Sequence, residues 1–290
     1  MTANPETLTL HRQQGVVRRL LRNYSGLVGS ILILLFAITG LLGAAGMTPY
    51  PPLEQHPRDR LTGPSAQYWL GTDLFGRDLT SRLMKGGANS LKVAVLSVAI
   101  ATFFGTIIGI TSGYLGGFFD NLIMRVMDIF FAFPSILLAL LIVVVLGPGL
   151  NNTILAIAIV YTPIFARVAR GPVLSLKEME FVTAARCLGI RQWRILFRHI
   201  LPNAMAPLIV QVSLALSWSL ITEAGLSFLG LGTQPPEPSW GLMLSESRAL
   251  AEIAPWLMFF PGLAIMLGVL GFNLLGDGLR DVLDPRMARR

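Results

Sequence analysis

The segment FVTAARCLGIRQWRILFRHILPN, residues 181–203, decides how the rest of this chain is interpreted, because it is basic and helix-like in an otherwise apolar sequence. The chain has 290 residues, of which 53% are hydrophobic and 13% are charged. Soluble domains carry about 25% charged residues, so this composition indicates a membrane protein. The net charge of +7 does not indicate nucleic-acid binding, because the basic residues lie between the apolar stretches.

Six apolar stretches flank this segment, and each is a candidate membrane span. A helix needs roughly 20 apolar residues to cross a bilayer. The stretches cover about residues 26–46, 91–112, 123–146, 153–168, 204–226 and 255–275, and the fourth is short and contains Pro163. The sequence therefore predicts an all-α polytopic membrane protein with one transmembrane domain over residues 26–279.

The distribution of Lys and Arg predicts the orientation of the spans. One side of the predicted membrane has Arg12, Arg18, Arg19, Arg22, Arg125, Arg167, Arg170, Lys177, Arg186, Arg191, Arg194, Arg198, Arg280, Arg286, Arg289 and Arg290. The other side has only Arg58, Arg60, Arg77, Arg82, Lys85 and Arg248, and Lys92 lies at a boundary. Cytoplasmic loops carry the excess of positive charge. This rule places residues 1–25, 171–203 and 280–290 in the cytoplasm, and residues 47–90 in an exterior loop.

Two features predict how the spans pack. Ala101, Gly105, Gly109 and Gly113 recur every four residues along the second span, and small residues at that spacing allow close helix contact. At the start of the third span, Arg125 and Asp128 are three residues apart and could pair on one helix face. We therefore expect a small-residue seam on the second span and an Arg125–Asp128 ion pair.

Polar residues within the last two spans are candidates for a translocation path, because polar groups in membranes are costly and often functional. The candidates are Gln211, Ser213, Ser217, Glu223 and Asn273. Glu223 lies near the outer face, either as a wetted interfacial carboxylate or as a substrate-facing group at the outer mouth. No buried chain of Asp, Glu and His is present in the spans to relay protons.

The first half of segment 181–203 reads as a short amphipathic helix. Phe181, Ala184, Ala185 and Leu188 follow the i, i+3, i+4, i+7 pattern of one apolar face. The two alanines make that face shallow at its centre. Gly189 follows where a helix commonly ends in a left-handed residue.

The second half reads as another amphipathic helix joined to the fifth span. Ile190, Trp193, Phe197 and Leu201 form its apolar stripe, and Pro202 suits the first turn of the following helix. Such a helix pair could lie on anionic lipid or dock into the groove of a partner protein. Paired alanines are a poor membrane anchor and a good close-contact surface, which favours docking.

The same residues resemble a known family. Thr183, Ala184 and Ala185, then Gly189, then Leu201 and Pro202, resemble the cytoplasmic motif of ABC-importer permeases, with Thr183 in place of its glutamate and His199 in place of its isoleucine. Glu180, one turn earlier, is a candidate for the missing charge. Segments 69–91, 120–140, 225–244 and 260–285 resemble the dipeptide, oligopeptide and nickel importer permeases, most of all the C-type dipeptide subunit.

This resemblance implies the type I ABC importer permease fold, with six transmembrane helices and short cytoplasmic coupling helices, in a bacterial inner membrane with both termini cytoplasmic. It also implies a homologous second permease, two ATPase subunits that use ATP and Mg²⁺, and a periplasmic or lipid-anchored solute-binding protein. Residues 47–90 would be periplasmic, and this chain itself would bind lipid but no cofactor, metal or nucleic acid. The implied ATPase-coupling residues are Glu180, Phe181, Thr183, Ala184, Ala185, Arg186, Leu188, Gly189, Leu201 and Pro202.

The implied function is that of half of an import path for short peptides, with nickel chelates, glutathione or another small solute as alternatives. The chain has no G-x-x-x-x-G-K-[ST] phosphate loop. We therefore expect a transport subunit without its own ATPase site. An ion-coupled secondary transporter would need coupling groups within the membrane, and a membrane enzyme would need a cluster of catalytic residues. The sequence shows neither.

Overall fold

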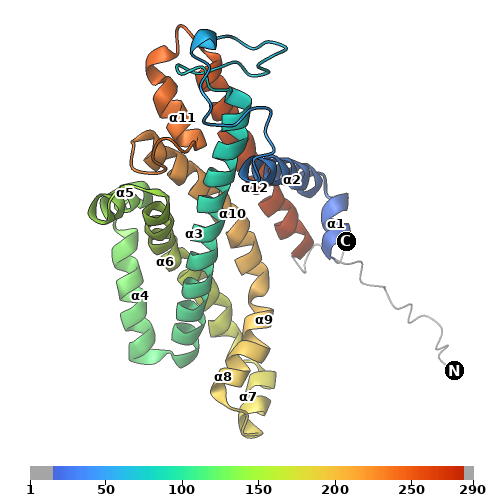
Figure 1. Cartoon of the computed structure of the whole chain (residues 1–290). Coiled ribbons are helices and arrows are strands. Elements are labelled where there is room, and N and C mark those ends of the chain that lie inside the picture. Colours follow the sequence, from blue (N-terminus) through green and yellow to red (C-terminus); the bar gives the residue numbers. More distant parts are fainter. Residues whose placement is uncertain (1–15, 284–290) are drawn as a thin grey trace, which may run out of the picture.

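The computed structural model describes residues 16–283 of the chain. Most of these residues form long apolar helices that lie side by side (Figure 1). Most of the predicted N-terminal segment and of the C-terminal tail therefore lies outside the described residues. The longer helices are α2 (Tyr24–Ala44), α3 (Leu79–Leu115), α4 (Gly117–Phe131), α5 (Ser135–Leu146), α6 (Leu150–Leu176), α10 (Met205–Phe228) and α12 (Trp256–Leu283). The shorter ones are α1 (Val16–Arg22), α7 (Glu180–Cys187), α8 (Gln192–Ile195), α9 (Leu201–Asn203) and α11 (Trp240–Ser247). These helices confirm the all-α prediction.

Five helices in the described residues are long and apolar enough to cross a membrane: α2, α3, α6, α10 and α12. Helices α4 and α5 meet at an angle of 90° and count as a sixth crossing only if the pair is taken together. Pro134 lies at the break, just before Ser135 begins α5, and proline has no N–H to donate to a helix. The predicted span over residues 123–146 is therefore bent in the middle, which the apolar composition does not reveal.

Helix α3 is much longer than the predicted span 91–112. It begins at Leu79, where Asp78 accepts a hydrogen bond at its N-terminus from Ser81 N (2.8 Å). Its length is about 55 Å at 1.5 Å per residue, more than the roughly 30 Å apolar core of a bilayer. Residues 79–90 are thus helical rather than part of the predicted exterior loop, because Asp78 caps them and Leu79, Arg82 and Ser90 are buried.

Helix α6 is also longer than its predicted span 153–168, since it continues through Pro163 and Pro172 to Leu176. Each proline costs the helix a hydrogen bond, about 3 kcal/mol in a helix interior. Burial of Phe165, Ala169 and Val173 against neighbouring helices offsets this cost. Sequence alone shows the prolines and not this burial.

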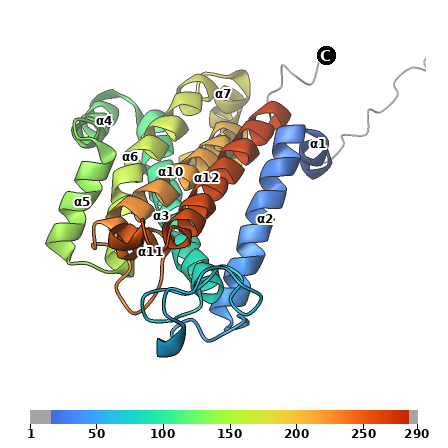
Figure 2. The same cartoon turned by 90° about the horizontal axis from the view of Figure 1, so that it is seen from above.

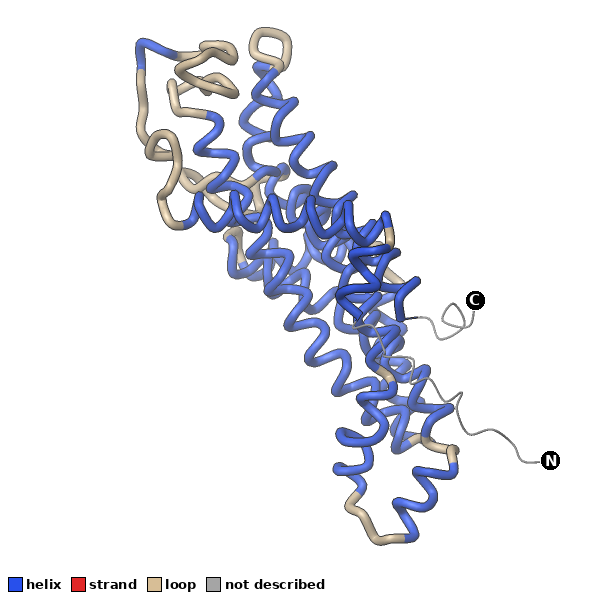
Figure 3. The backbone as a smooth tube through the Cα atoms, turned by 90° about the vertical axis from the view of Figure 1, so that its right-hand side faces the viewer, coloured by secondary structure: helices blue, strands red, loops and turns tan. Residues whose placement is uncertain are grey.

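The connections gather at two ends of the helix bundle (Figure 3). The α11 end comprises residues 45–78, 147–149 and 229–255, and the α7 end comprises residues 177–204 (Figure 1). The C-terminal part of α12 lies with the start of α10, because Arg280 and Leu283 line a hollow with Ala206. Seen from above, α2 lies on one side of α3, α10 and α12, and α4 and α5 lie on the opposite side (Figure 2).

Two apolar cores hold the bundle together. The larger one joins α3, α5, α6, α10 and the segment α7–α9, and contains Val98, Ile157, Phe165 and Ile200. The smaller one lies nearer the α11 end, where the buried Trp240 of α11 contacts Phe36 of α2 edge to face, with ring centroids 5.3 Å apart. Trp240 Nε1 also donates to Leu83 O (3.0 Å). This contact fixes α11 to α2 and α3.

The α11 end is an ordered structure built on an ion network. Arg77 Nε donates to Asp73 Oδ2 (2.6 Å), and Arg82 Nη2 donates to Glu246 Oε2 (2.8 Å). Arg82 is almost fully buried. Burial and a hydrogen bond to Asp59 raise the pKa of Tyr68 to about 12. The predicted exterior loop is thus folded up to the start of α3.

Two ion pairs join α4 to α6, and neither is the pair that the sequence predicted. Asp128 pairs with Arg167 (2.6 Å), and Asp120 pairs with Arg170 (2.6 Å) and accepts from Ser112 Oγ (2.5 Å). The predicted Arg125–Asp128 pair is therefore wrong. Local spacing allowed it, but α6 brings a guanidinium closer to the carboxylate of Asp128.

The small-residue seam on α3 is confirmed. A side chain at Gly105 would meet Phe165 and Thr162 O, and one at Gly109 would meet Ala166 O. Ala101 is fully buried. The backbones of α3 and α6 approach so closely that even one methyl group has no room at Gly109.

This contact generates a prediction with a matched control in another long helix. We expect Gly109→Ala to lower the free energy of unfolding by about 2 kcal/mol, because the new methyl group forces α3 away from α6. Gly262→Ala in α12 would meet only Leu244 Cδ2, at the ordinary contact distance of 3.9 Å. It should leave stability unchanged or raise it by up to about 1 kcal/mol. Thermal unfolding of the purified variants measures both, and equal stability of the two variants would contradict the seam.

Candidate functional site

Helix α7 and the turn that follows it form as the sequence predicts. Gly189 adopts φ +71°, the left-handed conformation that glycine tolerates best. Its N–H donates to Arg186 O (2.9 Å), and Ile190 N donates to Ala185 O (3.1 Å). This pair of hydrogen bonds is a Schellman motif, so Gly189 ends α7 and turns the chain toward α8.

Three of the four residues of the predicted apolar face of α7 are exposed, and the fourth, Ala185, is buried. Val182 is fully buried and Ala185 is 6% exposed, and both belong to the larger core with Ile195 and Ile200. Phe181 is 40% exposed, Leu188 is 79% exposed, and Ala184 is exposed as well. We call these last three residues the open face of α7. Ala185 does not belong to the open face, because it is buried in the larger core. The sequence pattern of a single helix could not show which neighbour would cover it.

The predicted apolar stripe of the second helix is exposed or half-buried in this chain. The positions buried in the structure are Ile195, Leu196 and Ile200, whereas Trp193 is 56% exposed. Residues 196–200 form a π-helical turn just before Pro202, whose missing N–H leaves Arg198 O without its usual helical partner. The predicted stripe of Ile190, Trp193, Phe197 and Leu201 therefore does not face the core as one unit.

The chain nevertheless connects this segment closely to α10, as predicted. Pro202 lies in the first turn of α9, and one turn at Ala204 separates α9 from α10. The backbone keeps right-handed helical angles at Ile200, Leu201 and Ala204. Movement of α7 and α8 would therefore reach α10 through a nearly continuous helical rod.

Two contacts attach the same segment to the end of α3. Lys177 Nζ donates to Gly113 O (3.0 Å), and the Arg186 guanidinium lies 5.3 Å from the centre of the Tyr114 ring. A cation over an aromatic face is stabilised by about 0.5–1 kcal/mol at an exposed site. Arg191, Arg194 and Arg198 are exposed, so the α7 end has a positive surface. Glu180 and Thr183 are exposed on α7 beside the open face.

The predicted path residues do not gather at one place in this chain. Ser213 packs against Gly276, and Ser217 Oγ donates to Val269 O (3.2 Å), so both lie in the contact of α10 with α12. Gln211 lines a hollow of about 380 Å³ with Val168 and Arg280, and Asn273 is half-buried.

Glu223 lies in a polar cluster between α10, α3 and α11. Its side chain is fully buried, and its Oε1 accepts from Ser227 Oγ (2.7 Å). Ser90 and Ser239 lie beside it, and Ser90 Oγ accepts from Trp240 N (3.2 Å). Its Oε2 has no hydrogen-bond partner. Neither predicted environment fits, since the carboxyl group is enclosed by protein rather than wetted or open to a mouth.

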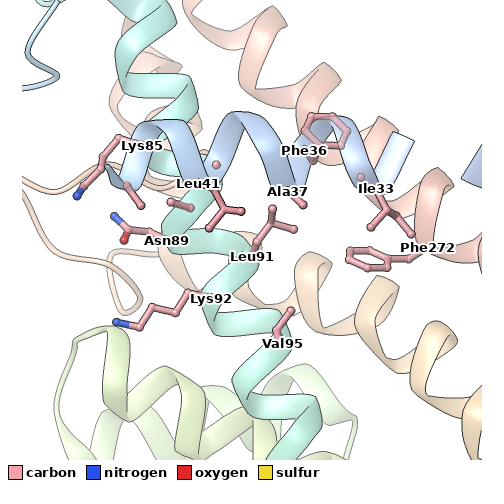
Figure 4. A pocket seen from close by; sticks show the side chains of 14 residues that line it. Ile33, Phe36, Ala37, Leu41, Lys85, Asn89, Leu91, Lys92, Val95 and Phe272 are labelled. Atoms are coloured by element: carbon pink, nitrogen blue, oxygen red, sulfur yellow. The ribbon is translucent and has the colours of Figure 1, made fainter. Parts of the chain in front are cut away.

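A hollow that the sequence analysis did not identify lies between α2, α3 and α12 (Figure 4). Its volume is about 570 Å³, and Lys85, Asn89 and Lys92 line one end of it. The sequence did contain a signal for this hollow, because these three polar residues are four and three residues apart and therefore share one face of α3. Among the described residues, no group of three or more His, Cys, Asp or Glu side chains could hold a metal ion.

Comparison with known proteins supports one family. A family model described as "Binding-protein-dependent transport system inner membrane component" matches residues 105–289. The dipeptide transport system permease protein DppC of Alkalihalophilus pseudofirmus is 50% identical over 270 residues, which cover 93% of this chain and 88% of that protein. The glutathione transport system permease protein GsiD of Pectobacterium atrosepticum is 46% identical over 271 residues, or 93% and 90% of the two chains.

The fold has a counterpart among solved structures. An inward-facing structure of the MetNI methionine ABC transporter superposes with a TM-score of 0.53 at 20% identity. The match covers 70% of this chain and 96% of that one. At this identity the likeness concerns the fold alone, and it agrees with the predicted permease architecture.

The two faces of α7 give opposite predictions for neighbouring alanines. Ala185→Glu places a charge among Val182 and Ile195, and we expect it to loosen residues 177–203, because a buried unpaired charge is costly. Ala184→Glu adds its charge in solvent and should change stability by less than about 0.5 kcal/mol. Limited trypsin digestion reports this directly, since Arg186, Arg191 and Arg194 are cleavage sites. Equal cleavage of both variants would contradict the assigned faces.

Proposed function

The chain belongs to the family of binding-protein-dependent transport system inner membrane components, and from this premise we propose that it is the permease subunit of an ATP-driven importer of short peptides. The two relatives above are named for a dipeptide and for glutathione, which is itself a tripeptide. A short peptide with a free carboxylate is the chemistry that both names share. Nickel chelates and other small solutes are the alternative cargoes.

The open face of α7 is the observation that carries the coupling role. Phe181, Ala184 and Leu188 are apolar, exposed and without a partner in the described part of the chain. Helix α7, which carries them, lies at one end of the molecule (Figure 1). A helix docked into a partner's groove presents anchors at i, i+3, i+4 and i+7, and this face has three of them. The partner that fits is one of two ATPase subunits, and a second permease and a solute-binding protein complete the importer.

The mechanism follows from how α7 is attached. ATP and Mg²⁺ are used by the partner ATPase subunits, so this chain contributes movement. Displacement of α7 passes to α3 through Lys177 and to α10 through the helical rod at residues 192–204. Helices α3 and α10 both reach the α11 end. The shift occurs only because ATP binding favours one state of the complex over the other.

Glu180 and Thr183 keep their proposed roles beside the open face. Glu180 lies in the first turn of α7, three residues before Thr183, so the two side chains are neighbours on the helix surface. A carboxylate at Glu180 can therefore reach the same region of a docked partner as the glutamate of the family motif. Gln211, which lines a hollow, and the half-buried Asn273 remain proposed path residues, whereas Ser213, Ser217 and Glu223 are buried within this chain.

The single cysteine tests the proposed orientation, in which α7 and both termini lie in the cytoplasm. Cys187 is free and exposed at the α7 end. A membrane-impermeant maleimide should therefore label the wild-type protein in inside-out vesicles and not in intact spheroplasts. As a control, Cys187→Ser combined with Gln67→Cys at the α11 end should show the reverse pattern. Labelling of Cys187 from the outside would reverse the proposed topology.

The open face gives a test of coupling. We expect Ala184→Glu to reduce ATP-driven dipeptide uptake at least about a hundredfold, because a charge at the docking surface blocks contact with the ATPase. Uptake is measured in proteoliposomes that contain the assembled importer. Cys187→Glu, an equal charge change on the same helix outside the open face, should retain most of the uptake. Normal uptake by a stable Ala184→Glu complex would rule out the docking role.

A further inference from the structure

The hollow between α2, α3 and α12 is amphipathic from end to end (Figure 4). Ile33, Phe36 and Phe272 lie at one end, and Lys85, Asn89 and Lys92 lie at the other. The polar end is nearer the α11 end, because α2 finishes at Ala44 and α3 starts at Leu79 there. A volume of about 570 Å³ falls in the 300–1,000 Å³ range typical of small-molecule sites.

One of the two lysines at the polar end, Lys92, has no ionic partner in the described residues. Lys85, Asn89 and Lys92 are spaced four and three residues apart, so they lie on one face of α3. Asn89 Nδ2 donates to Pro238 O (2.8 Å) and to Glu237 Oε2 (3.4 Å), and Lys85 Nζ forms a long ion pair with Glu237 Oε2 (4.0 Å). Lys92 is exposed and makes no hydrogen bond or ion pair within residues 16–283. No Asp or Glu lines the hollow, and Glu237 beside it offsets only one of the two lysines, so the remaining charge favours an anion.

The position of Lys92 indicates an occupant more specific than an acyl chain. Lys92 lies where the apolar part of α3 begins, beside Leu91 and Val95. Lysines at such depths usually face a protein interior or a water-filled cavity and pair there with an anion. The hollow combines an unpaired ammonium with an apolar chamber containing two aromatic rings.

We propose that this hollow is an entry subsite for the carboxyl-terminal residue of the transported peptide, which rests on the proposed function. The peptide's α-carboxylate binds the Lys92 ammonium, with Lys85 adding positive potential at the rim. The adjoining apolar side chain of the peptide packs against Phe36 and Phe272. Glu237, which lies within 4.0 Å of Lys85, is placed to attract the peptide's ammonium group.

The first arm of the test compares two solutes in the same importer. Uptake of L-alanyl-L-phenylalanine and of its C-terminal amide is measured with wild type and Lys92→Gln, using one solute-binding protein throughout. Because that protein is constant, a change in the acid-to-amide ratio of kcat/KM belongs to the permease. We expect the ratio to fall about tenfold in Lys92→Gln, the effect of losing one charge-assisted contact.

A matched control removes a charge elsewhere on the same side. Arg248 is exposed at the α11 end and lies outside the hollow. Arg248→Gln should keep the wild-type ratio, and Lys85→Gln should lower it by a smaller factor than Lys92→Gln. An unchanged ratio in Lys92→Gln, or an equal fall for acid and amide, overturns the subsite.

The second arm measures binding without transport. The purified complex in nanodiscs is titrated with the two solutes in the absence of ATP, by saturation-transfer NMR. Binding that prefers the acid in wild type and loses this preference in Lys92→Gln supports the subsite. Such binding would support the subsite even if the importer accumulated neither solute. A lack of accumulation would contradict only the proposal that short peptides are transported. Native mass spectrometry of the same samples identifies lipid, and a bound anionic lipid lost in Lys92→Gln, with peptide binding unchanged, overturns the proposal.

Discussion

The close contact of α3 with α6 is the constraint on which the remaining structure depends. The contact exists because Gly105 and Gly109 carry no side chain where Phe165 and Ala166 approach. In a bilayer, helices gain little from the hydrophobic effect between them, so close van der Waals contact is a main source of their association. Once α3 and α6 are joined, the larger core can close over them with α5, α10 and the segment α7–α9.

The length of α3 turns that contact into a mechanical connection between the two ends of the molecule. Arg82 and Ser90, near its start, contact Glu246 and Trp240 at the α11 end. Gly113 and Tyr114, near its finish, contact Lys177 and Arg186 at the α7 end. A rigid helix with specific contacts at both ends can pass a displacement over a distance that no single pair of side chains could cover. The proposed function requires such a connection, because it places the coupling segment and the solute entrance at opposite ends of the molecule.

Buried polar groups occur where several helices must keep one fixed arrangement. The Ser97 and Ser219 hydroxyls, 2.8 Å apart, join α3 to α10, and Asp120 with Arg170 and Ser112 joins α4 to α6 and α3. Isolated polar groups in an apolar medium are costly, so these groups favour the one packing that satisfies them. The apolar face of α4 and α5, by contrast, carries exposed side chains such as Phe118, Ile129 and Leu141, which suits contact with lipid or another membrane subunit.

The sequence by itself determined the class of protein, the number of apolar stretches, the small-residue seam and the left-handed turn at Gly189. Each depends on composition or on spacing within one helix, which neighbouring elements do not alter. For the same reason it singled out residues 181–203 as the segment proposed for coupling. Only the tertiary structure decided that α4 and α5 bend apart, that Asp128 pairs with Arg167, and that Ala185 is buried while Ala184 is open. A helix pattern shows which residues share a face, but the neighbour that covers that face comes from a distant part of the chain, and its position is fixed by packing.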